Sequence, residues 1–493
     1  MRLDKWLVLF CLAFPVAASA DVTTGGVNWL DPLGYTKPAF YPLTLPTPGV
    51  NQYWVNLSGG SGSGCTSGTP CSWSSIAGKA GTTGSGGGAY IYIQGTGSMS
   101  DIVLNGTVGN EIVIRPRDDS TTATITGRNN WSAIKHYVVF DGGPNAQIRF
   151  LCTGCGQFDP VIYLSENANS TAIQNLTFYR TRWHVSASGM QFQSYAYFTN
   201  LYFINSEFDA LGSSDTTNQH HIYMSQFGTG DGRLGTGFYV INCILRDTPG
   251  EAIEMRMAGT NSEINGGAIT GSVFHDVGKG TCNNVSWKCR GAITMAEGDI
   301  SNLLIANNLI WETGEGAMRN WSNDNTVLIR NNTIWNFGMG TPANSAWSSA
   351  AFSNAGFSGT VPGDFKNNLV LMSGNDANGN TKRVFNNNNN QGTFMGCPTG
   401  LNCGTSNQLI SSATFASLDD TDPNFLKLVA ASTPIDHGTA VCATTTDYFG
   451  TARPVNSTCD IGAQEFCSGG CGAVDTTFST GDGRIIIRKK GSH

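Results

Sequence analysis

A short motif returns along the middle of the chain, and it decides the fold. In each return an Asn, once a Gly, stands three residues before a large apolar residue. The returns are Gln174-Asn175-Leu176-Thr177-Phe178, Ile204-Asn205-Ser206-Glu207-Phe208, Ile241-Asn242-Cys243-Ile244-Leu245, Thr270-Gly271-Ser272-Val273-Phe274, Ala306-Asn307-Asn308-Leu309-Ile310, Arg330-Asn331-Asn332-Thr333-Ile334 and Lys366-Asn367-Asn368-Leu369-Val370. They recur every 24 to 37 residues. Such a period predicts a solenoid, in which each repeat buries its apolar face only against its neighbours.

The size and composition of the chain agree with an ordered solenoid. Its 493 residues exceed the size at which one globular core usually keeps growing, whereas a solenoid core lengthens instead. Only 13% of the residues are charged, but 40% are hydrophobic and fall in regular Ile, Val, Phe and Trp runs. These features favour an ordered all-β protein.

The charge balance bears on possible partners. The formal net charge is −7, the sequence pI is near 5.5, and no basic run is large enough to follow a nucleic-acid backbone. We therefore expect no nucleic-acid partner. An acidic polysaccharide would have to be met by local Arg and Lys side chains.

The first twenty residues have the pattern of a secretory signal peptide. Arg2 and Lys5 precede an apolar stretch at 6–16, and Ala18-Ser19-Ala20 resembles a cleavage site. The apolar stretch is too short to span a bilayer, and no later segment is long and apolar enough. We expect a secreted, extracellular protein without membrane insertion.

Most of the fourteen cysteines fall into close sequence pairs, which in an exported chain favours short-loop disulfides. The expected pairs are Cys65 with Cys71, Cys152 with Cys155, Cys282 with Cys289, Cys397 with Cys403, Cys442 with Cys459, and Cys467 with Cys471. Cys243 stands in the repeat at an apolar position and is expected to be a buried free thiol.

The two ends of the repeat region carry a family resemblance. The segment Tyr53-Trp54-Val55-Asn56-Leu57-Ser58 precedes a Gly/Ser stretch, Ser74-Ser75-Ile76 and strand-like runs at 89–93, 110–116 and 136–142. The far end contains Asp422-Pro423-Asn424-Phe425, Ser432-Thr433-Pro434-Ile435-Asp436-His437-Gly438, Asp447-Tyr448-Phe449-Gly450-Thr451-Ala452-Arg453-Pro454 and Asp460-Ile461-Gly462-Ala463-Gln464-Glu465. Together these segments resemble the opening and the closing strands of secreted right-handed parallel β-helix proteins of the pectate-lyase-like superfamily.

The resemblance implies an all-β, single-stranded, right-handed parallel β-helix with disulfide-stapled loops. It spans roughly residues 53–466 and is specific for the fold rather than for an activity. The expected organisation is a signal peptide at 1–20, an extended segment at 21–52, the β-helix at 53–466 and a tail at 467–493.

Each central coil carries a second apolar motif. Ile and Met two residues apart are expected to point inward in 221–224, 252–256 and 292–295, with Tyr223, Glu254 and Thr294 pointing outward between them. The Asn residues of the first motif are expected to hydrogen-bond along a ladder at a corner of the coil.

Counting five places from the repeat Asn aligns Asp247, Asp276 and Glu312 on successive coils. Parallel strands stack about 4.8 Å apart, so these carboxylates are candidates for one outward column. Such a column suits a Ca²⁺ site or acid/base carboxylates. The alternative is that each residue only caps a bend.

The densest local cluster is Gly250-Glu251-Ala252-Ile253-Glu254-Met255-Arg256. It is similar to the stretch in alginate-lyase and chondroitinase-B-like β-helix enzymes where acidic Ca²⁺ ligands precede a basic catalytic residue. The similarity implies that Glu251 and Glu254 hold Ca²⁺ and that Arg256 stands in the place of the base. Those enzymes have Lys there, and Arg is hard to deprotonate. The alternative is an exposed Glu/Arg pair on a β-face.

Further candidates lie on the neighbouring coils. His221, next to His220, is a candidate base or sugar contact, and Tyr223 is a substrate contact. Arg319 and Trp321 are candidates for binding a carboxylate and a sugar ring. Lys279, near Lys288 and the Cys282–Cys289 excursion, is an alternative base. The alternative for each is a solvated surface residue.

The preferred function is Ca²⁺-dependent β-elimination of an extracellular uronate-containing polysaccharide. Asp247, Asp276, Glu251 and Glu254 are the candidate metal ligands. A glycoside hydrolase on the same fold, and a non-catalytic β-helix for carbohydrate binding, adhesion or surface assembly, are the alternatives.

Overall fold

The computed structural model covers the repeat region and both of its flanks. The residues that it describes are 45, 51–79, 81, 88–152, 159–165, 173–185, 190–210, 220–225, 234–257, 263–278, 291–296, 298–321, 326–339, 350–354, 364–371, 383–387, 408–410, 415–420, 422, 424–438, 442, 444, 446–467, 476–477 and 488–489.

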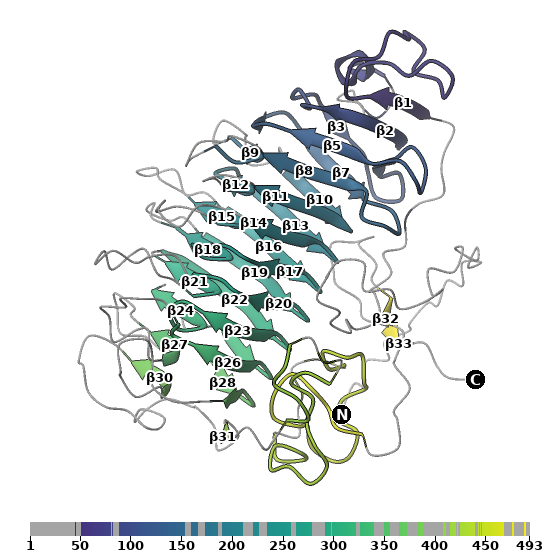
Figure 1. Ribbon diagram of the computed structural model, residues 1–493. Coiled ribbons are helices and arrows are strands. Elements are labelled where there is room, and N and C mark those ends of the chain that lie inside the picture. The colour runs from purple at the N-terminus through teal and green to yellow at the C-terminus, as the bar shows by residue number, and fades with distance from the viewer. Residues whose placement is uncertain are drawn as a thin grey trace, which may run out of the picture.

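The strands stack in three faces around one long axis (Figure 1). The first face contains β1 (Gln52–Asn56), β2 (Ala89–Gly97), β3 (Leu104–Asn105), β4 (Ile112–Pro116), β7 (Lys135–Asp141), β10 (Ile173–Tyr179), β13 (Phe198–Ile204), β16 (Leu234–Ile241), β19 (Glu263–Thr270), β22 (Asp299–Ala306), β25 (Leu328–Arg330) and β28 (Asp364–Lys366). The second face contains the end of β2 and β5 (Ala123–Thr126), β8 (Ile148–Cys152), β11 (Thr181–Val185), β14 (Glu207–Ala210), β17 (Ile244–Arg246), β20 (Val273–His275), β23 (Leu309–Thr313), β26 (Thr333–Phe337), β29 (Leu369–Leu371) and β31 (Gln408–Ile410). The third face contains β6 (Asn129–Trp131), β9 (Ile162–Leu164), β12 (Phe192–Ser194), β15 (Ile222–Ser225), β18 (Ile253–Arg256), β21 (Ile293–Ala296), β24 (Met318–Trp321), β27 (Ala350–Asn354) and β30 (Arg383–Asn387).

One coil contributes one strand to each face. In the central coil these are β16, β17 and β18, and each pairs in parallel with the equivalent strand one coil on, β19, β20 and β21. The molecule is therefore the predicted right-handed parallel β-helix. The one antiparallel ladder among the described strands joins β32 (Thr476–Thr477) to β33 (Arg488–Lys489). A short 3₁₀ turn, η1 (Trp73–Ile76), buries Trp73 and Ile76 next to β1.

The repeat Asn marks the corner between the first and second faces. Asn205, Asn242 and Asn307 have φ of 50°, 52° and 55°, a left-handed conformation that Asn tolerates better than most residues. The first return was wrongly aligned. Asn175 lies inside β10, and the corner of that coil is Arg180, with φ of 54°.

The residue after the corner forms the predicted ladder. Asn308 Nδ2 donates to Asn332 Oδ1 (3.0 Å), and Asn332 Nδ2 donates to Asn368 Oδ1 (2.9 Å). Ser272 continues the column, because its backbone N–H donates to Asn308 Oδ1 (2.9 Å). The side chains of this ladder are buried, so the corner is fixed by satisfied polar groups rather than by apolar packing.

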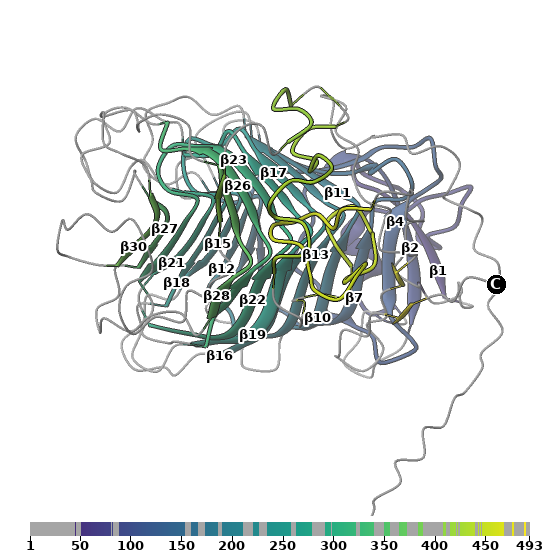
Figure 2. The same cartoon turned by 90° about the horizontal axis from the view of Figure 1, so that it is seen from below.

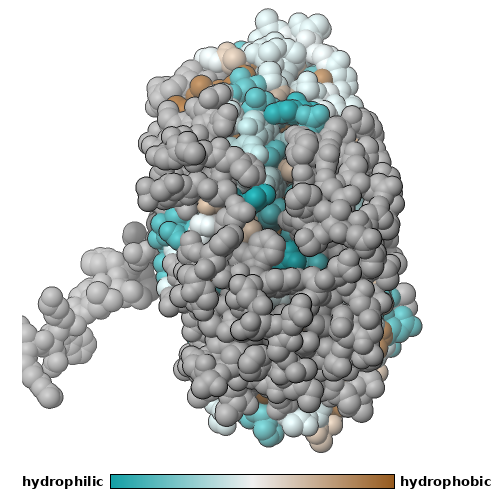
Figure 3. Space-filling view, turned by 90° about the vertical axis from the view of Figure 1, so that its left-hand side faces the viewer, coloured by the Kyte–Doolittle hydropathy of each residue, from teal (hydrophilic) through white to brown (hydrophobic). Residues whose placement is uncertain are grey.

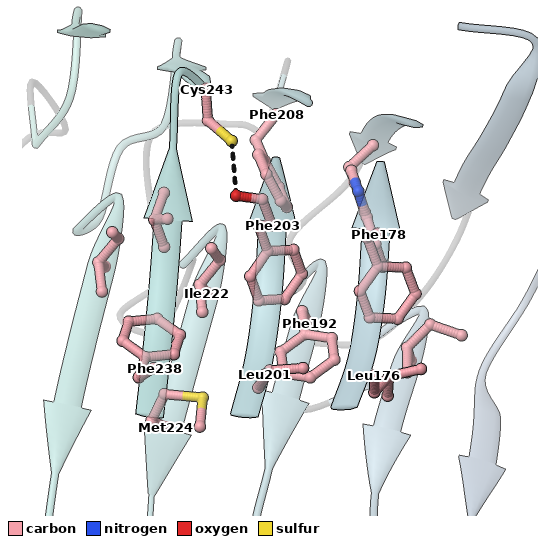
Figure 4. Close-up of a cluster of buried hydrophobic side chains, with 14 of the residues drawn as sticks. Leu176, Phe178, Phe192, Leu201, Phe203, Phe208, Ile222, Met224, Phe238 and Cys243 are labelled. Atoms are coloured by element: carbon pink, nitrogen blue, oxygen red, sulfur yellow. Dashed lines mark hydrogen bonds between the residues drawn. The ribbon is translucent and has the colours of Figure 1, made fainter. Parts of the chain in front are cut away.

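Apolar side chains from all three faces fill the interior (Figure 4). Phe178 and Phe203 stack on successive coils with ring centroids 5.2 Å apart, and Phe192 meets Phe203 edge to face. Cys243 is the predicted buried free thiol, and its Sγ donates to the carbonyl oxygen of Phe203 (3.4 Å). Repeated stacking of like side chains carries the core from coil to coil.

Two of the expected disulfides lie wholly within the described residues, Cys65–Cys71 and Cys442–Cys459. Cys152 and Cys467 are also disulfide-bonded. Their expected partners, and the expected pairs Cys282–Cys289 and Cys397–Cys403, lie outside the described residues.

The described residues of 415–466 pack along the side of the last coils instead of extending the stack (Figures 1 and 2). Phe425 meets Trp311 and Trp335 of the second face edge to face, and Asn331 Nδ2 donates to the carbonyl oxygen of Asp460 (3.0 Å). Where the closing strands were expected, the described residues form only isolated bridges, such as Phe425 with Ser417 and Ala452 with Thr446.

None of the helices in the described part of the chain has the length and apolar character needed to cross a membrane.

Candidate functional site

The outward side chains of the third face form columns in strand register. Tyr223 of β15 lies beside Glu254 of β18, followed by Thr294 of β21 and Arg319 of β24. The Ile and Met residues on either side of Tyr223, Glu254 and Thr294 point into the core, as predicted, because successive side chains of a strand point to opposite sides. On the side of the molecule where this face lies, hydrophilic described residues gather in a central strip (Figure 3).

A compact polar cluster lies in this register. It consists of His220, Glu251 and Glu254, with one ligand atom of each within 4.8 Å of the others, and it is the one such group of His, Cys, Asp and Glu among the described residues. His220 Nδ1 is 3.1 Å from Glu251 Oε2, and its Nε2 is 3.2 Å from Glu254 Oε2. All three residues are at most 3% exposed. The imidazole thus lies between two buried carboxylates.

Strand pairing explains why these residues meet. Ile222 pairs with Ile253 across β15 and β18, so His220 and Glu251 occupy the same place in the turns that enter the two strands. Glu254 is the first outward residue of β18. Tyr223 closes the cluster, because its ring stacks on the His220 ring with centroids 4.9 Å apart. The cluster therefore joins two successive coils.

The Tyr223 phenol keeps its proton at neutral pH. Burial raises the pKa of Tyr223, and the neighbouring Glu254 carboxylate raises this pKa further. Tyr223 therefore offers a protonated hydroxyl beside the carboxylates.

His221 is placed differently from His220. It is fully buried, its Nδ1 lies 2.9 Å from Gln191 Oε1, and its Nε2 lies 2.8 Å from the carbonyl oxygen of Arg246. Burial lowers the pKa of His221 to about 3, so the ring is neutral at physiological pH. This geometry assigns His221 to the packing between the second and third faces rather than to contact with a substrate.

The two predicted arginines differ in accessibility. Arg256 is partly exposed, and its register neighbours Ser225 and Ala296 are small. Arg319 is 3% exposed and forms an ion pair with Glu315 of its own coil. Arg256 is therefore the better placed of the two to meet an anionic ligand.

Two further predicted residues have no described side chain. Trp321 is the last residue of β24 and pairs with Ala296, and nothing more is described of it. Lys279 lies outside the described residues.

The predicted carboxylate column lies at another corner. Asp247 and Asp276 directly follow the second-face strands β17 and β20, and Glu312 takes the equivalent place within β23; their φ angles are 58°, 55° and 53°. Asp247 is paired with Arg246 (2.7 Å), and Asp276 with His275 (2.8 Å). The structure therefore does not bring Asp247 or Asp276 into the cluster with Glu251 and Glu254.

A ladder of charges runs along the outside of the second face. His184, Asp209 and Arg246 are register neighbours on β11, β14 and β17, and His184 Nδ1 is hydrogen-bonded to Asp209 Oδ1. That hydrogen bond raises the pKa of His184. Burial alone would raise the pKa of Asp209, but His184 and Arg246 lower it overall. Arg246 also pairs with Glu207 (2.8 Å), so these charges compensate one another within the ladder.

The cluster does not match the calcium that the resemblance implies. Ca²⁺ takes six to eight oxygen ligands. Here the third donor group is an imidazole, whose two nitrogens face Glu251 and Glu254. The described residues thus offer a mixed nitrogen and oxygen donor set, which calcium does not favour.

The sequence indicated His221, not its neighbour His220, as the candidate functional residue. The alignment of one coil with the next is the information that identifies His220. Once Ile222 and Ile253 are aligned, residue 220 falls opposite residue 251. The motif Ile-x-Met, which occurs in both strands, was sufficient for that alignment.

Comparisons with known proteins agree with the fold. No protein-family model matches the chain, and no curated protein matches it. Among solved structures the chain is similar to "Crystal structure of pectate lyase Pel9A", with a TM-score of 0.53 and 14% sequence identity. The match covers 86% of this chain and 98% of that one. At this identity the likeness establishes the pectate-lyase-like parallel β-helix fold and no activity.

Proposed function

We propose that this protein is an exported enzyme that cleaves an extracellular uronate-containing polysaccharide by β-elimination on its third face. The observation that carries the proposal is the buried His220–Glu251–Glu254 cluster, with Tyr223 against it and Arg256 on the same strand. Buried titratable groups gathered at one place on a scaffold are typical of functional sites. Export rests on the leader pattern at 1–20.

β-Elimination makes three demands on a protein. The uronate carboxylate must be neutralised, a base must take the proton on the carbon next to it, and the leaving oxygen must receive a proton. Arg256 suits the first demand, because a guanidinium binds a carboxylate with two parallel hydrogen bonds and seldom loses its own proton. Tyr223 suits the third demand, because its phenol is protonated and can donate.

The base is the least constrained of the three roles. His221 is buried and neutral with both ring nitrogens close to protein oxygens, so we do not assign the role to it. Lys279 is the proposed base, since a Lys amine can lose its proton in a suitable environment, whereas Arg256 cannot do so readily. Arg319, held by Glu315, is proposed to support the wall of the site, and Trp321 to contact a sugar ring.

The test is a screen of polygalacturonate, alginate and chondroitin with the full-length chain. β-Elimination creates an unsaturated sugar end that absorbs in the ultraviolet, and we expect this absorbance to rise with one of the three. Arg256→Leu should lower kcat/KM by at least ~100-fold, as expected for the loss of a charge that stabilises the transition state. Arg149→Leu, an exposed arginine on the second face, is the matched control and should leave the rate unchanged.

Other products would point to the alternatives. Reducing ends without ultraviolet absorbance would identify a glycoside hydrolase, for which the paired carboxylates Glu251 and Glu254 are the natural candidates. Binding without cleavage would identify a non-catalytic carbohydrate-binding protein. Cleavage that survives Arg256→Leu and Lys279→Met unchanged would overturn the assigned roles.

A further inference from the structure

We propose that His220, Glu251 and Glu254 bind one divalent first-row transition-metal ion, with zinc preferred over calcium. The proposal deepens the proposed function, on which it rests for the role of the site. Its physical basis is independent of any activity, since it depends only on donor type, spacing and burial.

The donor set decides the class of metal. Imidazole nitrogen with carboxylate oxygen is a combination used by Zn²⁺ and its first-row neighbours, whereas Ca²⁺ selects oxygen donors alone. Zn²⁺ bonds of about 2.0–2.2 Å hold the donor atoms of a site roughly 3–4 Å apart. One donor atom of each of the three residues lies within 4.8 Å of the others, and His220 Nδ1 is 3.1 Å from Glu251 Oε2. Small side-chain rotations therefore suffice to close the set around an ion.

A second observation points to a ligand for the imidazole. His220 Nδ1 is buried and makes no hydrogen bond among the described residues, although Glu251 Oε2 is 3.1 Å away. A buried polar atom without a hydrogen bond lowers the stability of the folded state, and such atoms are rare in native proteins unless they have a functional role. A metal ion would use the lone pair of such a nitrogen.

The placement of the two carboxylates also suits a metal-binding imidazole. Each ring nitrogen of His220 faces one of them. With Nδ1 on the ion, Nε2 still faces Glu254 Oε2, and the other oxygen of that carboxylate remains for the ion. A carboxylate in that position fixes the orientation of the ring and makes it a stronger ligand. Two buried carboxylates with oxygens within 4.8 Å of each other also favour a cation beside them.

Metal binding would also cross-link two successive coils. His220 lies just before β15, while Glu251 and Glu254 lie just before and within β18 of the next coil. An ion that binds only the folded chain raises its thermal stability. The proposal therefore has a readout that needs no substrate.

The experiment uses the full-length chain after removal of metals with a chelator. Zn²⁺ and Ca²⁺ are titrated separately by calorimetry, and bound metal is counted by mass spectrometry. We expect one Zn²⁺ per chain, bound at least ~100-fold more tightly than Ca²⁺, and a higher Tm with Zn²⁺. Co²⁺ in place of zinc should show a visible absorption band that reports nitrogen and oxygen ligands.

The key variant is His220→Gln, which replaces the imidazole with an amide. It should weaken Zn²⁺ binding by at least ~10-fold and abolish the Co²⁺ band. His275→Gln is the matched control, because His275 is equally buried and paired with one carboxylate but lies outside the cluster. It should keep both Zn²⁺ affinity and the Co²⁺ band. If His220→Gln does not fold, Glu254→Gln makes the same test.

The proposal is overturned if the wild-type chain binds no stoichiometric zinc, if it binds calcium as tightly as zinc, or if a folded His220→Gln or Glu254→Gln variant keeps full Zn²⁺ affinity. Failure of the proposed function looks different. Tight zinc binding with no cleavage of any uronate polysaccharide would leave the metal site standing and remove the lyase assignment.

Discussion

Asn332 is the residue at which the stability of the coil corner can be tested most directly. Its side-chain Nδ2 donates to the carbonyl oxygens of Ile305 (3.0 Å) and Arg330 (3.1 Å) and to Asn368 Oδ1 (2.9 Å). Its Oδ1 accepts from the backbone N–H (3.1 Å) and the Nδ2 (3.0 Å) of Asn308. Asn332→Leu keeps a side chain of similar size and removes all five of these hydrogen bonds.

The expected cost follows from which groups lose their last partner. Asn308 Nδ2 still donates to the carbonyl oxygen of Ile269 (2.9 Å), and Asn368 Oδ1 still accepts from the backbone N–H of residue 332 (3.1 Å). The backbone N–H of Asn308 loses its acceptor, which costs roughly 1–3 kcal/mol. The other four hydrogen bonds are worth about 0.5–1 kcal/mol each. We expect Asn332→Leu to lower the free energy of unfolding by about 3–7 kcal/mol.

A serine variant separates the hydrogen bonds from the change in packing. Serine occupies the same ladder position in other coils, where Ser272 Oγ accepts from the N–H of Cys243 and Ser206 Oγ from that of Thr181, both at 3.1 Å. Asn332→Ser therefore keeps an acceptor for the neighbouring coil. Its cost should be about 1–2 kcal/mol, clearly below that of the Leu variant.

The assay is urea unfolding combined with hydrogen exchange of peptides covering 303–313, which contain the Asn308 amide. Asn424→Leu, at an exposed position, is the matched control and should change stability by less than about 0.5 kcal/mol. The reasoning is refuted if Asn332→Leu costs less than about 1 kcal/mol or no more than Asn332→Ser. Either result would mean that the ladder contributes packing only.

Two further predictions concern pH. Burial raises the pKa of Asp447 from 3.8 to about 6, so its stabilising contribution is complete below pH 3.8 and is lost as pH rises through 6. The free energy of unfolding of Asp447→Asn, relative to that of wild type, should therefore rise by about 2–3 kcal/mol from pH 4 to pH 7 in urea unfolding. A difference between the two proteins that does not change with pH would contradict this. The pKa of His184 is raised in the folded protein, so the contribution of the protonated ring to folding stability is complete below pH 6.5 and is lost as the pH rises above that value. An NMR titration of the His184 ring should give a pKa above 6.5, which falls in Asp209→Asn; a value at or below 6.5 in wild type would contradict the pairing.

The sequence predicted the scaffold well because the scaffold repeats. The inward Ile and Met of the third-face strands and the free thiol of Cys243 follow from periodicity and composition alone. The misalignment of Asn175 has a physical cause. Asn tolerates a left-handed φ, and this conformation occurs both at the corner and within first-face strands, at Asn175 and Asn200. The same residue type therefore marks two different columns.

The candidate site was only half predictable, because it depends on register between coils. Glu251 and Glu254 are three residues apart at the start of one strand, so their proximity is evident from the sequence alone. His220 joins them from 31 residues earlier, and its place depends on how the turns before β15 and β18 align. The burial of the site could not be predicted from strand alternation either. Tyr223 and Glu254 point outward from the coil, yet their side chains are only 5% and 3% exposed.

The three turns of a coil differ in how much sequence change they allow, and this difference explains where chemistry collects. From β13 to β29 the corner between the first and second faces contains only two residues, as between β16, which ends at Ile241, and β17, which begins at Ile244. One of the two takes the left-handed φ and the other joins the buried ladder, so neither can be replaced freely. The turn from the second to the third face is not bound in this way. It spans 247–252 in one coil and 276–292 in the next. The residues just before each third-face strand can therefore be substituted without loss of the coil register, because the corner between the first and second faces maintains that register. His220 and Glu251 both lie in the turn from the second to the third face, on successive coils. The ladder at the other corner fixes the spacing between these coils, and the residues of this turn can differ from coil to coil and so determine which ligand binds.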